Sequence, residues 1–318
     1  MRRKTFVFSL LVLINSCFNP AQAEDKLVRL ISEQKEYHQN NFLRKVNFDN
    51  IERKYLIHLP IGYSNDKKYP VIFVFHGGGA TAMHMRWVCS MDEKADQEKF
   101  IVIYPDGTGE FPDRNHSFNV GPGYGYAWEN NIDDIGFVEY IITELKQFFS
   151  IDEKRIYATG FSNGAMLCYR LASVIPDKIA AIAPIGAVLD PQWLNYQKYV
   201  PIIHFHGLKD QFFPFNGGKG KKFGKKINTF PSVMQTIYWY LDNIKVSRDP
   251  KQVIRKNKAV GYLYGDDKDS QKLVLWILED GGHTWPGARA ILDSMGRVNR
   301  DISANDLMWE FFQKHKLD

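Results

Sequence analysis

Five residues near the middle of the chain, Gly160-Phe161-Ser162-Asn163-Gly164, form the pattern G-x-S-x-G. The apolar stretch before them, residues 155–159, predicts a strand, and residues 163–174 predict a helix. In this setting the sharp turn exposes the serine hydroxyl at the edge of a sheet, and the two glycines let the backbone pass closely. We therefore predict that Ser162 is a nucleophile, in a strained turn where the start of the helix favours developing negative charge.

A serine hydroxyl attacks an ester only when a base takes its proton. Two later segments supply the partners: Asp210 follows a predicted strand at residues 200–205, and His283 follows one at residues 273–278. The order Ser, acid, His is that of α/β-hydrolases. We predict that His283 accepts the proton of Ser162 and later protonates the leaving alcohol, while Asp210 orients the imidazole.

Other titratable residues are weaker candidates for these roles. Asp190 and Asp242 do not directly follow a predicted buried strand, and Asp280 lies too near His283 in the sequence to be its partner. His315 falls on the predicted terminal helix. Such aspartates are ordinarily solvated at the surface.

His204 and His206 form an H-x-H pair on one face of a predicted strand, a pattern that also occurs in metal sites. No third ligand with supporting spacing is evident. We therefore expect no metal and no cofactor.

A glycine-rich segment, His76-Gly77-Gly78-Gly79, follows the apolar run at residues 71–75. It fits the HGGG-type loop that supplies oxyanion donors, and glycine allows the backbone to approach a substrate closely. We predict that the backbone N–H groups of Gly78 and Asn163 form the oxyanion hole. His76 itself is expected to have a structural hydrogen-bonding role.

The elements that must position these residues alternate between strand and helix from about residue 50 onward. This alternation predicts an α/β fold with a mostly parallel central sheet flanked by helices. Strands are expected at residues 53–59, 71–75, 100–104, 155–159, 179–185, 200–205, 259–264 and 273–278. Helices are expected at residues 133–149, 163–174, 231–241 and 304–315, and residues 107–130 form an irregular excursion.

The first 23 residues predict a signal peptide. Residues 2–4 are basic, residues 5–17 are largely apolar, and Ala21-Gln22-Ala23 offers a cleavage site. Cleavage there would leave residues 24–318 as a single catalytic domain, secreted or periplasmic, with no stable membrane insertion. An uncleaved anchor and a lipoprotein signal ending at Cys17 are the alternatives.

The charge of the chain gives no case for nucleic-acid binding. The formal net charge of +5 falls to +2 once the three positive charges of the leader are removed. A lysine- and glycine-rich stretch at residues 217–226 is expected to be a solvated loop, with a docking site for an acidic polymer as the alternative.

Two cysteines, Cys89 and Cys168, remain after the leader. An exported protein could pair them in a disulfide. Cys168 falls on the helix beneath the nucleophile, where a buried free thiol is equally expected. The sequence leaves both states open.

Five separated motifs together resemble the polyhydroxybutyrate depolymerase and feruloyl-esterase-like family of α/β-hydrolases (the LpqC type). They lie at residues 76–79, 131–137, 157–166, 206–210 and 282–287, and the resemblance covers about residue 50 to the C-terminus. It implies the same triad roles for Ser162, Asp210 and His283. It also implies substrates among hydroxyalkanoate polyesters and the feruloyl or acetyl esters of plant polysaccharides.

Aromatic residues are abundant around the predicted site: Tyr124, Tyr126, Trp128, Phe161, Phe212, Phe213 and Trp285. Trp128, Phe161 and Trp285 are our candidates for substrate binding. Packing in the core is the alternative for each of them.

The sequence thus predicts a secreted serine carboxylic-ester hydrolase that works through an acyl-enzyme on a small or oligomeric ester. A peptidase of the same fold is one alternative, although such enzymes usually carry an additional gating domain. The other is a non-catalytic surface or carbohydrate-binding protein on a hydrolase scaffold. The sequence leaves the acyl group, the alcohol and the oligomeric state open.

Overall fold

A computed structural model describes residues 40–194, 198–221, 229–265 and 271–318. The predicted leader and residues 222–226 of the lysine- and glycine-rich stretch lie outside the described residues. Within that stretch, β8 (Gly218–Lys219) pairs with β9 (Thr229–Phe230), and both residues of β8 are exposed, as a solvated loop requires.

The described chain begins with an antiparallel hairpin of β1 (Asn41–Phe48) and β2 (Ile51–His58). Its two turn residues, Asp49 and Asn50, have φ values of 53° and 61°. Two consecutive positive φ angles give the turn a twist that matches the flanking strands, and Asp and Asn adopt them more readily than most residues. β1 lies before the region where the sequence analysis placed the first strand.

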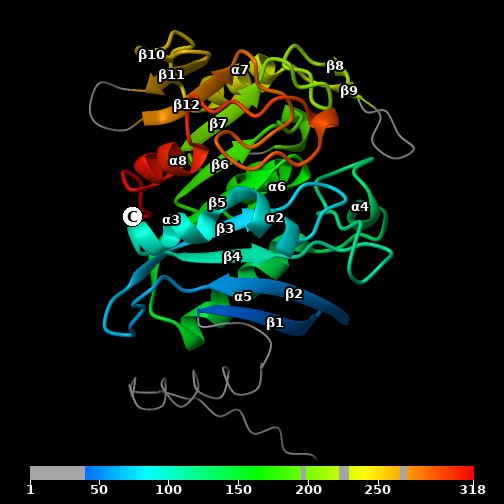
Figure 1. The fold of residues 1–318 in the computed structure, drawn as a ribbon, viewed down its shortest axis with the longest axis vertical. Helices are drawn as coiled ribbons and strands as arrows, with labels where there is room; N and C mark the ends of the chain where they lie inside the picture. Colours follow the sequence, from blue (N-terminus) through cyan, green and yellow to red (C-terminus); the bar gives the residue numbers. More distant parts are fainter. Residues whose placement is uncertain (1–39, 195–197, 222–228, 266–270) are drawn as a thin grey trace, which may run out of the picture.

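A ten-stranded sheet forms the centre of the molecule (Figure 1). Across the sheet the strands are β1, β2, β4 (Ile101–Pro105), β3 (Tyr69–Phe75), β5 (Ile151–Phe161), β6 (Ala181–Ile185), β7 (Ile202–Gly207), β12 (Gln271–Leu278), β11 (Ala259–Gly265) and β10 (Gln252–Lys256). The strands from β4 to β12 in this order run parallel, and antiparallel pairs flank them. The predicted mostly parallel sheet is confirmed.

Helices cover both faces of this sheet (Figure 1). One face packs against α5 (Asp134–Phe148), α6 (Asn163–Val174) and α7 (Val233–Asn243). The other packs against α2 (Ala82–Cys89), α3 (Met91–Glu98) and α8 (Ala304–Phe312). Along β3, alternate side chains such as Phe73 and Val74 enter the two cores in turn, which explains why the whole strand is apolar.

Cys89 and Cys168 are both free and buried. Cys89 belongs to the core under α2, and Cys168 to the core under α6. Because the sheet separates these two cores, the thiols cannot form the disulfide that the sequence left open. Burial raises the pKa of the Cys89 thiol to about 12 and that of Cys168 well above its ordinary value, so both stay protonated at neutral pH.

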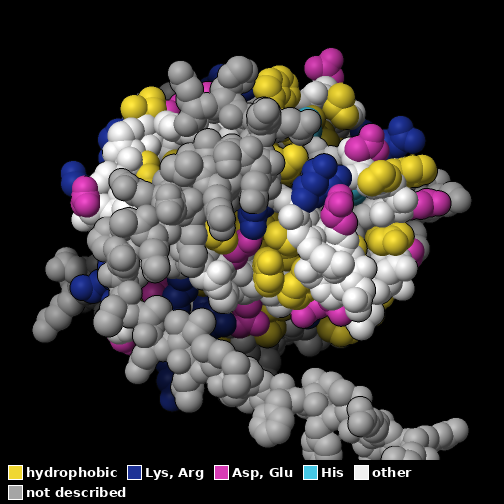
Figure 2. All heavy atoms as spheres, turned by 90° about the horizontal axis from the view of Figure 1, so that it is seen from below, with side chains coloured by type: hydrophobic (Ala, Val, Ile, Leu, Met, Phe, Trp, Pro, Cys, Tyr) yellow, Lys and Arg dark blue, Asp and Glu magenta, His cyan; other side chains and the backbone are white. Residues whose placement is uncertain are grey.

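The surface carries charges of both signs. On the face that Figure 2 shows, the basic and acidic side chains that the grey atoms do not cover are interspersed. No large patch of one sign is seen among the uncovered side chains of this face. Within the described ranges, no helix combines the length and the hydropathy that a membrane span requires.

Candidate active site

The turn between β5 and α6 holds Ser162 in an unusual backbone conformation, with φ of 56° and ψ of −117°. Few residues with a side chain adopt such angles, and they persist only where the surroundings impose them. Here the N–H of Ser162 donates to the carbonyl of Ile185 on β6 at 2.9 Å, and its carbonyl accepts from the N–H of Met166 on α6 at 3.1 Å. The strained serine is thus fixed between strand and helix.

The two glycines of the G-x-S-x-G motif are required by close backbone contacts. A Cβ atom on Gly160 would lie 2.5 Å from the carbonyl group of Gly164. A Cβ atom on Gly164 would lie 2.5 Å from the carbonyl oxygen of Phe75 and 2.6 Å from that of His76. The predicted tight passage is therefore observed, and it joins the elbow to the end of β3.

The predicted acid and base lie in direct contact. Oδ2 of Asp210 is 2.7 Å from Nδ1 of His283, and Oδ1 of Asp210 accepts the N–H groups of Phe212 and Phe213. Burial alone would raise the pKa of Asp210, but the charge and the hydrogen bond of His283 outweigh it and lower that pKa. A carboxylate at this position keeps the proton of His283 on Nδ1, which leaves Nε2 as an acceptor.

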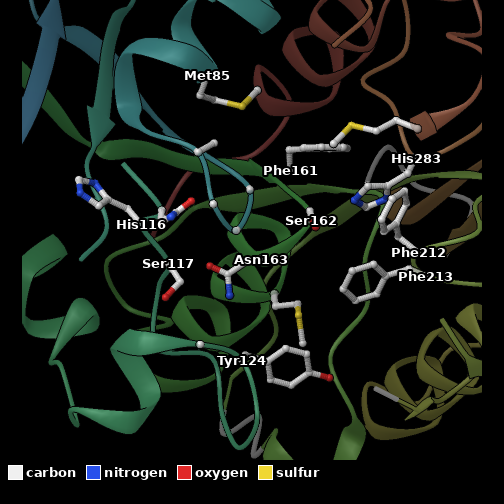
Figure 3. A pocket seen from close by; sticks show the side chains of 18 of the residues that line it. Met85, His116, Ser117, Tyr124, Phe161, Ser162, Asn163, Phe212, Phe213 and His283 are labelled. Atoms are coloured by element: carbon white, nitrogen blue, oxygen red, sulfur yellow. The ribbon is translucent and has the colours of Figure 1, made fainter. Parts of the chain in front are cut away.

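Ser162 and His283 line the same pocket, and in Figure 3 the imidazole of His283 lies beside Ser162. Three phenyl rings contact this imidazole. The ring centroids of Phe161 and Phe212 lie 4.6 and 5.3 Å from it, and the ring of Phe213 is stacked on it at 5.6 Å. These rings limit the orientations open to the base.

His204 and His206 form a buried chain of hydrogen bonds that ends at Phe213, whose N–H donates to Asp210. Nε2 of His206 donates to the carbonyl of Phe213 at 2.8 Å, so Nδ1 of His206 accepts from Nε2 of His204 at 3.1 Å. Nδ1 of His204 then accepts from the hydroxyl of Tyr169 at 3.0 Å. Burial lowers the pKa of both imidazoles. Every ring nitrogen of the pair is used in this chain, which favours a structural role over metal binding.

The glycine-rich loop lies against the elbow. A Cβ atom on Gly77 would lie 3.3 Å from Cβ of Ser162, and the N–H of Gly79 donates to the carbonyl of His116 at 2.8 Å. The N–H groups of Gly78 and Asn163 have no acceptor among the described residues, and both residues line the pocket. Two unpaired donors near a nucleophile are the arrangement that an oxyanion hole requires.

The side chain of Asn163 fixes its own backbone. Oδ1 accepts the N–H of Phe118 at 2.7 Å, and Nδ2 donates to the carbonyl of the same residue at 3.2 Å. These two hydrogen bonds to the backbone of one residue tie the first residue of α6 to the excursion at residues 107–130. The N–H of Asn163 is thereby held in position before any substrate arrives.

The pocket has a volume of about 550 Å³ and is mostly apolar around the serine. Of the three aromatic residues proposed for substrate binding, Phe161 lines it. Trp128 does not, and its ring packs against Trp193 at 6.5 Å instead. The proposal for Trp285 was wrong: its side chain is buried in the core under α2 and α8, where Nε1 donates to Asn305 at 2.9 Å.

Other side chains complete the apolar wall of the pocket. They are Met85 and Val88 of α2, Met166 of α6, Tyr124, Phe212, Phe213, Phe230, Ile291 and Met295. The sequence marked Tyr124, Phe212 and Phe213 only as nearby aromatics. It gave no sign of Met85 and Val88, because their helix was not predicted.

Comparison with known proteins shows the family of the chain. Residues 58–238 match the model of a family described as phospholipase/carboxylesterase. The chain is 27% identical over 236 residues to feruloyl esterase B of Piromyces equi, covering 73% of this chain and 42% of that protein. It is 31% identical over 152 residues to a bifunctional acetylxylan esterase/xylanase of Neocallimastix patriciarum, covering 48% of this chain and 21% of that protein. The chain thus spans less than half the length of these two relatives.

A solved structure shares the fold. The acetyl xylan esterase from Aspergillus awamori superimposes with a TM-score of 0.61 at 15% identity, over 86% of this chain and 99% of that one. At this identity the likeness concerns the architecture, which is that of an α/β-hydrolase.

Proposed function

The chain belongs to the phospholipase/carboxylesterase family and is similar to feruloyl esterase B of Piromyces equi, and we propose that it is a carboxylic-ester hydrolase that works through an acyl-enzyme on Ser162. The observation that carries this proposal is the 2.7 Å contact between Asp210 and His283 beside the strained serine. It supplies an oriented base next to a nucleophile whose hydroxyl is exposed to a pocket.

The reaction follows from the position of each group. Nε2 of His283 takes the proton of Ser162 as Oγ bonds to the ester carbonyl carbon. The N–H groups of Gly78 and Asn163 stabilise the oxyanion that forms. His283 then gives the proton to the leaving alcohol, and the C–O bond to that alcohol breaks. Water, deprotonated by His283, attacks the acyl-enzyme, and the free acid leaves with Ser162 restored.

The apolar wall of the pocket supports an ester whose acyl group is aromatic or apolar. Feruloyl and acetyl esters of polysaccharides, and hydroxyalkanoate oligomers, are the substrate classes we propose. The named activities of the two curated relatives favour the first two. A screen across these three ester classes, ranked by kcat/KM, tests this part of the proposal.

We further propose that residues 1–23 are a signal peptide and that residues 24–318 act as one catalytic domain in the periplasm or outside the cell. The basic start, the apolar run and the A-x-A site at residues 21–23 support this. Mass spectrometry of the protein recovered outside the cytoplasm should then give Glu24 as the first residue. Recovery of the intact N-terminus would contradict it.

The catalytic proposal is tested at the nucleophile. Ser162→Ala should abolish hydrolysis of p-nitrophenyl acetate and labelling by a fluorophosphonate probe. Ser117→Ala is the matched control, because Ser117 lines the same pocket and has no part in the proposed steps. Full turnover in Ser162→Ala would overturn the assignment. Wild-type protein that neither reacts with the probe nor turns over any ester would favour the non-catalytic alternative, and cleavage of peptides alone would favour a peptidase.

A further inference from the structure

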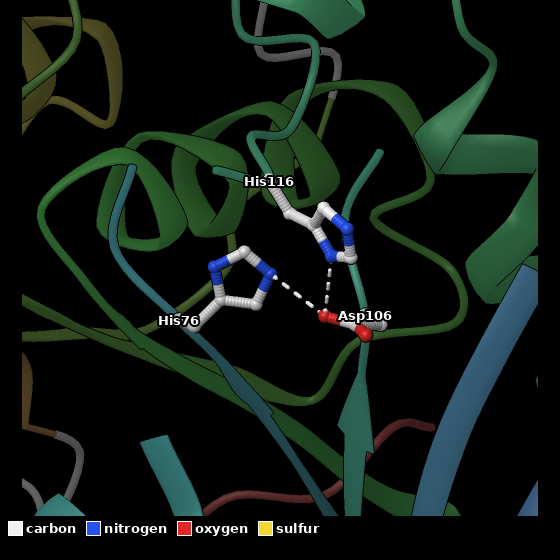
Figure 4. Close-up of side chains that lie close together, drawn as sticks. All are labelled: His76, Asp106 and His116. Carbon is white, nitrogen blue, oxygen red and sulfur yellow. Dashed lines mark hydrogen bonds and ion pairs between the residues drawn. The ribbon is translucent and has the colours of Figure 1, made fainter. Parts of the chain in front are cut away.

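Three titratable side chains lie together behind the glycine-rich loop (Figure 4). His76 follows β3, Asp106 follows β4, and His116 comes from the excursion at residues 107–130. Oδ1 of Asp106 lies 3.0 Å from Nδ1 of His116 and 3.4 Å from Nε2 of His76. None of the three has a role in the catalytic steps proposed above.

The hydrogen bonds of His116 fix its protonation state. Nε2 lies 2.9 Å from the carbonyl oxygen of Phe111, which can only accept, so Nε2 carries a hydrogen. Nδ1 faces Oδ1 of Asp106, and the same oxygen accepts the N–H of Ala82 at 3.0 Å, as a carboxylate does. Because both ring nitrogens face acceptors, the imidazole is satisfied only as a cation.

His76 differs from His116 in this respect. Its Nε2 accepts the N–H of Gly107 at 2.9 Å, so its Nδ1 carries the single hydrogen and donates to the carbonyl of Gly77 at 2.8 Å. His76 is therefore neutral. The three groups are close enough to share a cation, but these bonds occupy the ring nitrogens, so the cluster is arranged as an ion pair beside a neutral imidazole.

The two partners of the ion pair bind the chain at the end of the glycine-rich loop and at the start of α2. The carbonyl of His116 accepts the N–H of Gly79, the residue after the predicted oxyanion donor Gly78. The carboxylate of Asp106 accepts the N–H of Ala82 at the start of α2. The segment from residue 79 to residue 82 is thus fixed at both ends by the two partners of one ion pair.

We propose that Asp106 and the His116 imidazolium are positioning residues for the oxyanion hole, and that loss of the His116 proton sets the alkaline limit of ester hydrolysis. The proposal rests on the esterase function above. A neutral His116 would keep its Nδ1 hydrogen toward the Asp106 carboxylate, as His283 does toward Asp210, and would turn the lone pair of Nε2 toward the Phe111 carbonyl. This repulsion, together with the loss of the ion pair, would shift the His116 backbone whose carbonyl anchors Gly79. The N–H of Gly78 would then lose its fixed position relative to the developing oxyanion.

The surrounding charges agree with a cationic His116. Burial by itself would lower the pKa of His116, but the Asp106 carboxylate and the Phe111 carbonyl raise it above its ordinary value. Lys54 on β2 opposes this increase from a distance. Arg53, also on β2, donates to the backbone carbonyl of Asp106, and its charge is balanced by an ion pair with Asp134.

The pH profile of kcat tests the proposal. In the wild type, kcat should fall at alkaline pH as His116 loses its proton. Asp106→Asn keeps the oxygen acceptor but removes the charge, so the alkaline fall should move at least about one pH unit toward acid. His116→Gln should lower kcat about 10- to 100-fold, leave KM within about threefold, and remove the alkaline fall altogether.

His84→Gln is the matched control, since His84 lines the same pocket without contacting Asp106. Its profile should keep the alkaline fall. The rate of Ser162→Ala at each pH supplies the correction for spontaneous hydrolysis. An alkaline fall that stays in place in both Asp106→Asn and His116→Gln would overturn the proposal while leaving the esterase assignment intact.

A second measurement does not depend on activity. Wild-type protein labelled at histidine Cε1 should show one imidazole, absent from the spectrum of His116→Gln, that titrates above pH 6.5 and shifts toward acid in Asp106→Asn. Titration of that resonance at or below pH 6.5 in the wild type would contradict the proposal, even if one of the variants failed to fold.

Discussion

Gly160 and Gly164 touch across the turn that carries Ser162: a Cβ atom on Gly160 would lie 2.5 Å from the carbonyl carbon and oxygen of Gly164. The turn is therefore closed by backbone packing alone. Gly164 in turn lies against the carbonyl groups of Phe75 and His76 at the end of β3. Any side chain at either glycine displaces the nucleophile relative to the glycine-rich loop.

Gly164→Ala should destabilise the protein by about 1–3 kcal/mol, because its new methyl group overlaps two backbone carbonyls that cannot move independently. It should also reduce kcat more than 100-fold through misplacement of Ser162. Urea unfolding and ester turnover measure the two effects. Gly62→Ala is the control, since its Cβ would meet nothing within 4 Å, and it should cost only about 1–2 kcal/mol of backbone strain with kcat unchanged.

Asp210→Asn should retain the fold and reduce kcat about 10⁴-fold, because the amide no longer holds the proton of His283 on Nδ1. Asp242→Asn is the control, because Asp242 is exposed and pairs with Arg248. It should leave kcat within about twofold of the wild type. Equal losses in both variants would argue against Asp210 as the acid.

The lowered pKa of Asp210 predicts a stability change in acid. A carboxyl whose pKa is lower in the folded state stabilises the protein above its unfolded pKa of about 3.9 and loses that contribution as the pH falls through the folded pKa. The stability gap between wild type and Asp210→Asn, measured by urea unfolding, should therefore shrink between pH 6 and pH 3. A gap that grows toward pH 3 would mean that Asp210 is protonated in the folded protein.

The buried chain of hydrogen bonds that links Tyr169, His204, His206 and Phe213 predicts two effects that can be measured separately. Tyr169→Phe removes the donor to His204 and should destabilise the protein by about 1–3 kcal/mol with little change in kcat. His206→Leu removes the donor to the Phe213 carbonyl, whose residue also binds Asp210, so it should lower kcat about tenfold as well. Urea unfolding and ester turnover should be measured for both variants. An equal fall of kcat in both would contradict the prediction that only His206→Leu affects catalysis.

The position of Tyr124 on the pocket wall predicts that it favours esters with a large aromatic acyl group. Burial raises the pKa of Tyr124 to about 12, so its hydroxyl stays neutral wherever the enzyme works. Tyr124→Ala should lower kcat/KM for a feruloyl ester about tenfold and leave that for an acetyl ester within about threefold, because the larger acyl group loses an apolar contact. Tyr124→Phe isolates the hydroxyl. A uniform loss for both esters would place the ring away from the acyl group.

The sequence predicted the strands of the parallel sheet well because each is an apolar run followed within two residues by Gly, Pro or Asp, as residues 71–75 before His76-Gly77 illustrate. α3 was missed because its segment is strongly charged, and only Met91 and Ala95 on it are buried, too few to form an apolar stripe. β10 was missed for a related reason: four of its five residues are exposed.

At the site, order along the chain was enough to choose Asp210 and His283, since loops at the carboxyl ends of parallel strands meet at one edge. Side-chain direction in a loop has no comparable rule. Trp285 lies two residues from His283, yet its indole turns to the opposite side and bonds to Asn305 at the start of α8. The contact between Asp106 and His116 was equally hidden, because His116 lies in the irregular excursion at residues 107–130.

The backbone angles of Ser162 have a consequence for the history of this scaffold. Glycine would adopt φ of 56° and ψ of −117° without a steric penalty, whereas serine is held there by its neighbours. In a descendant that kept the fold only to bind a ligand, a glycine at position 162 would remove this backbone strain without loss of function. A serine at this strained position is what the proposed role of Ser162 as nucleophile requires.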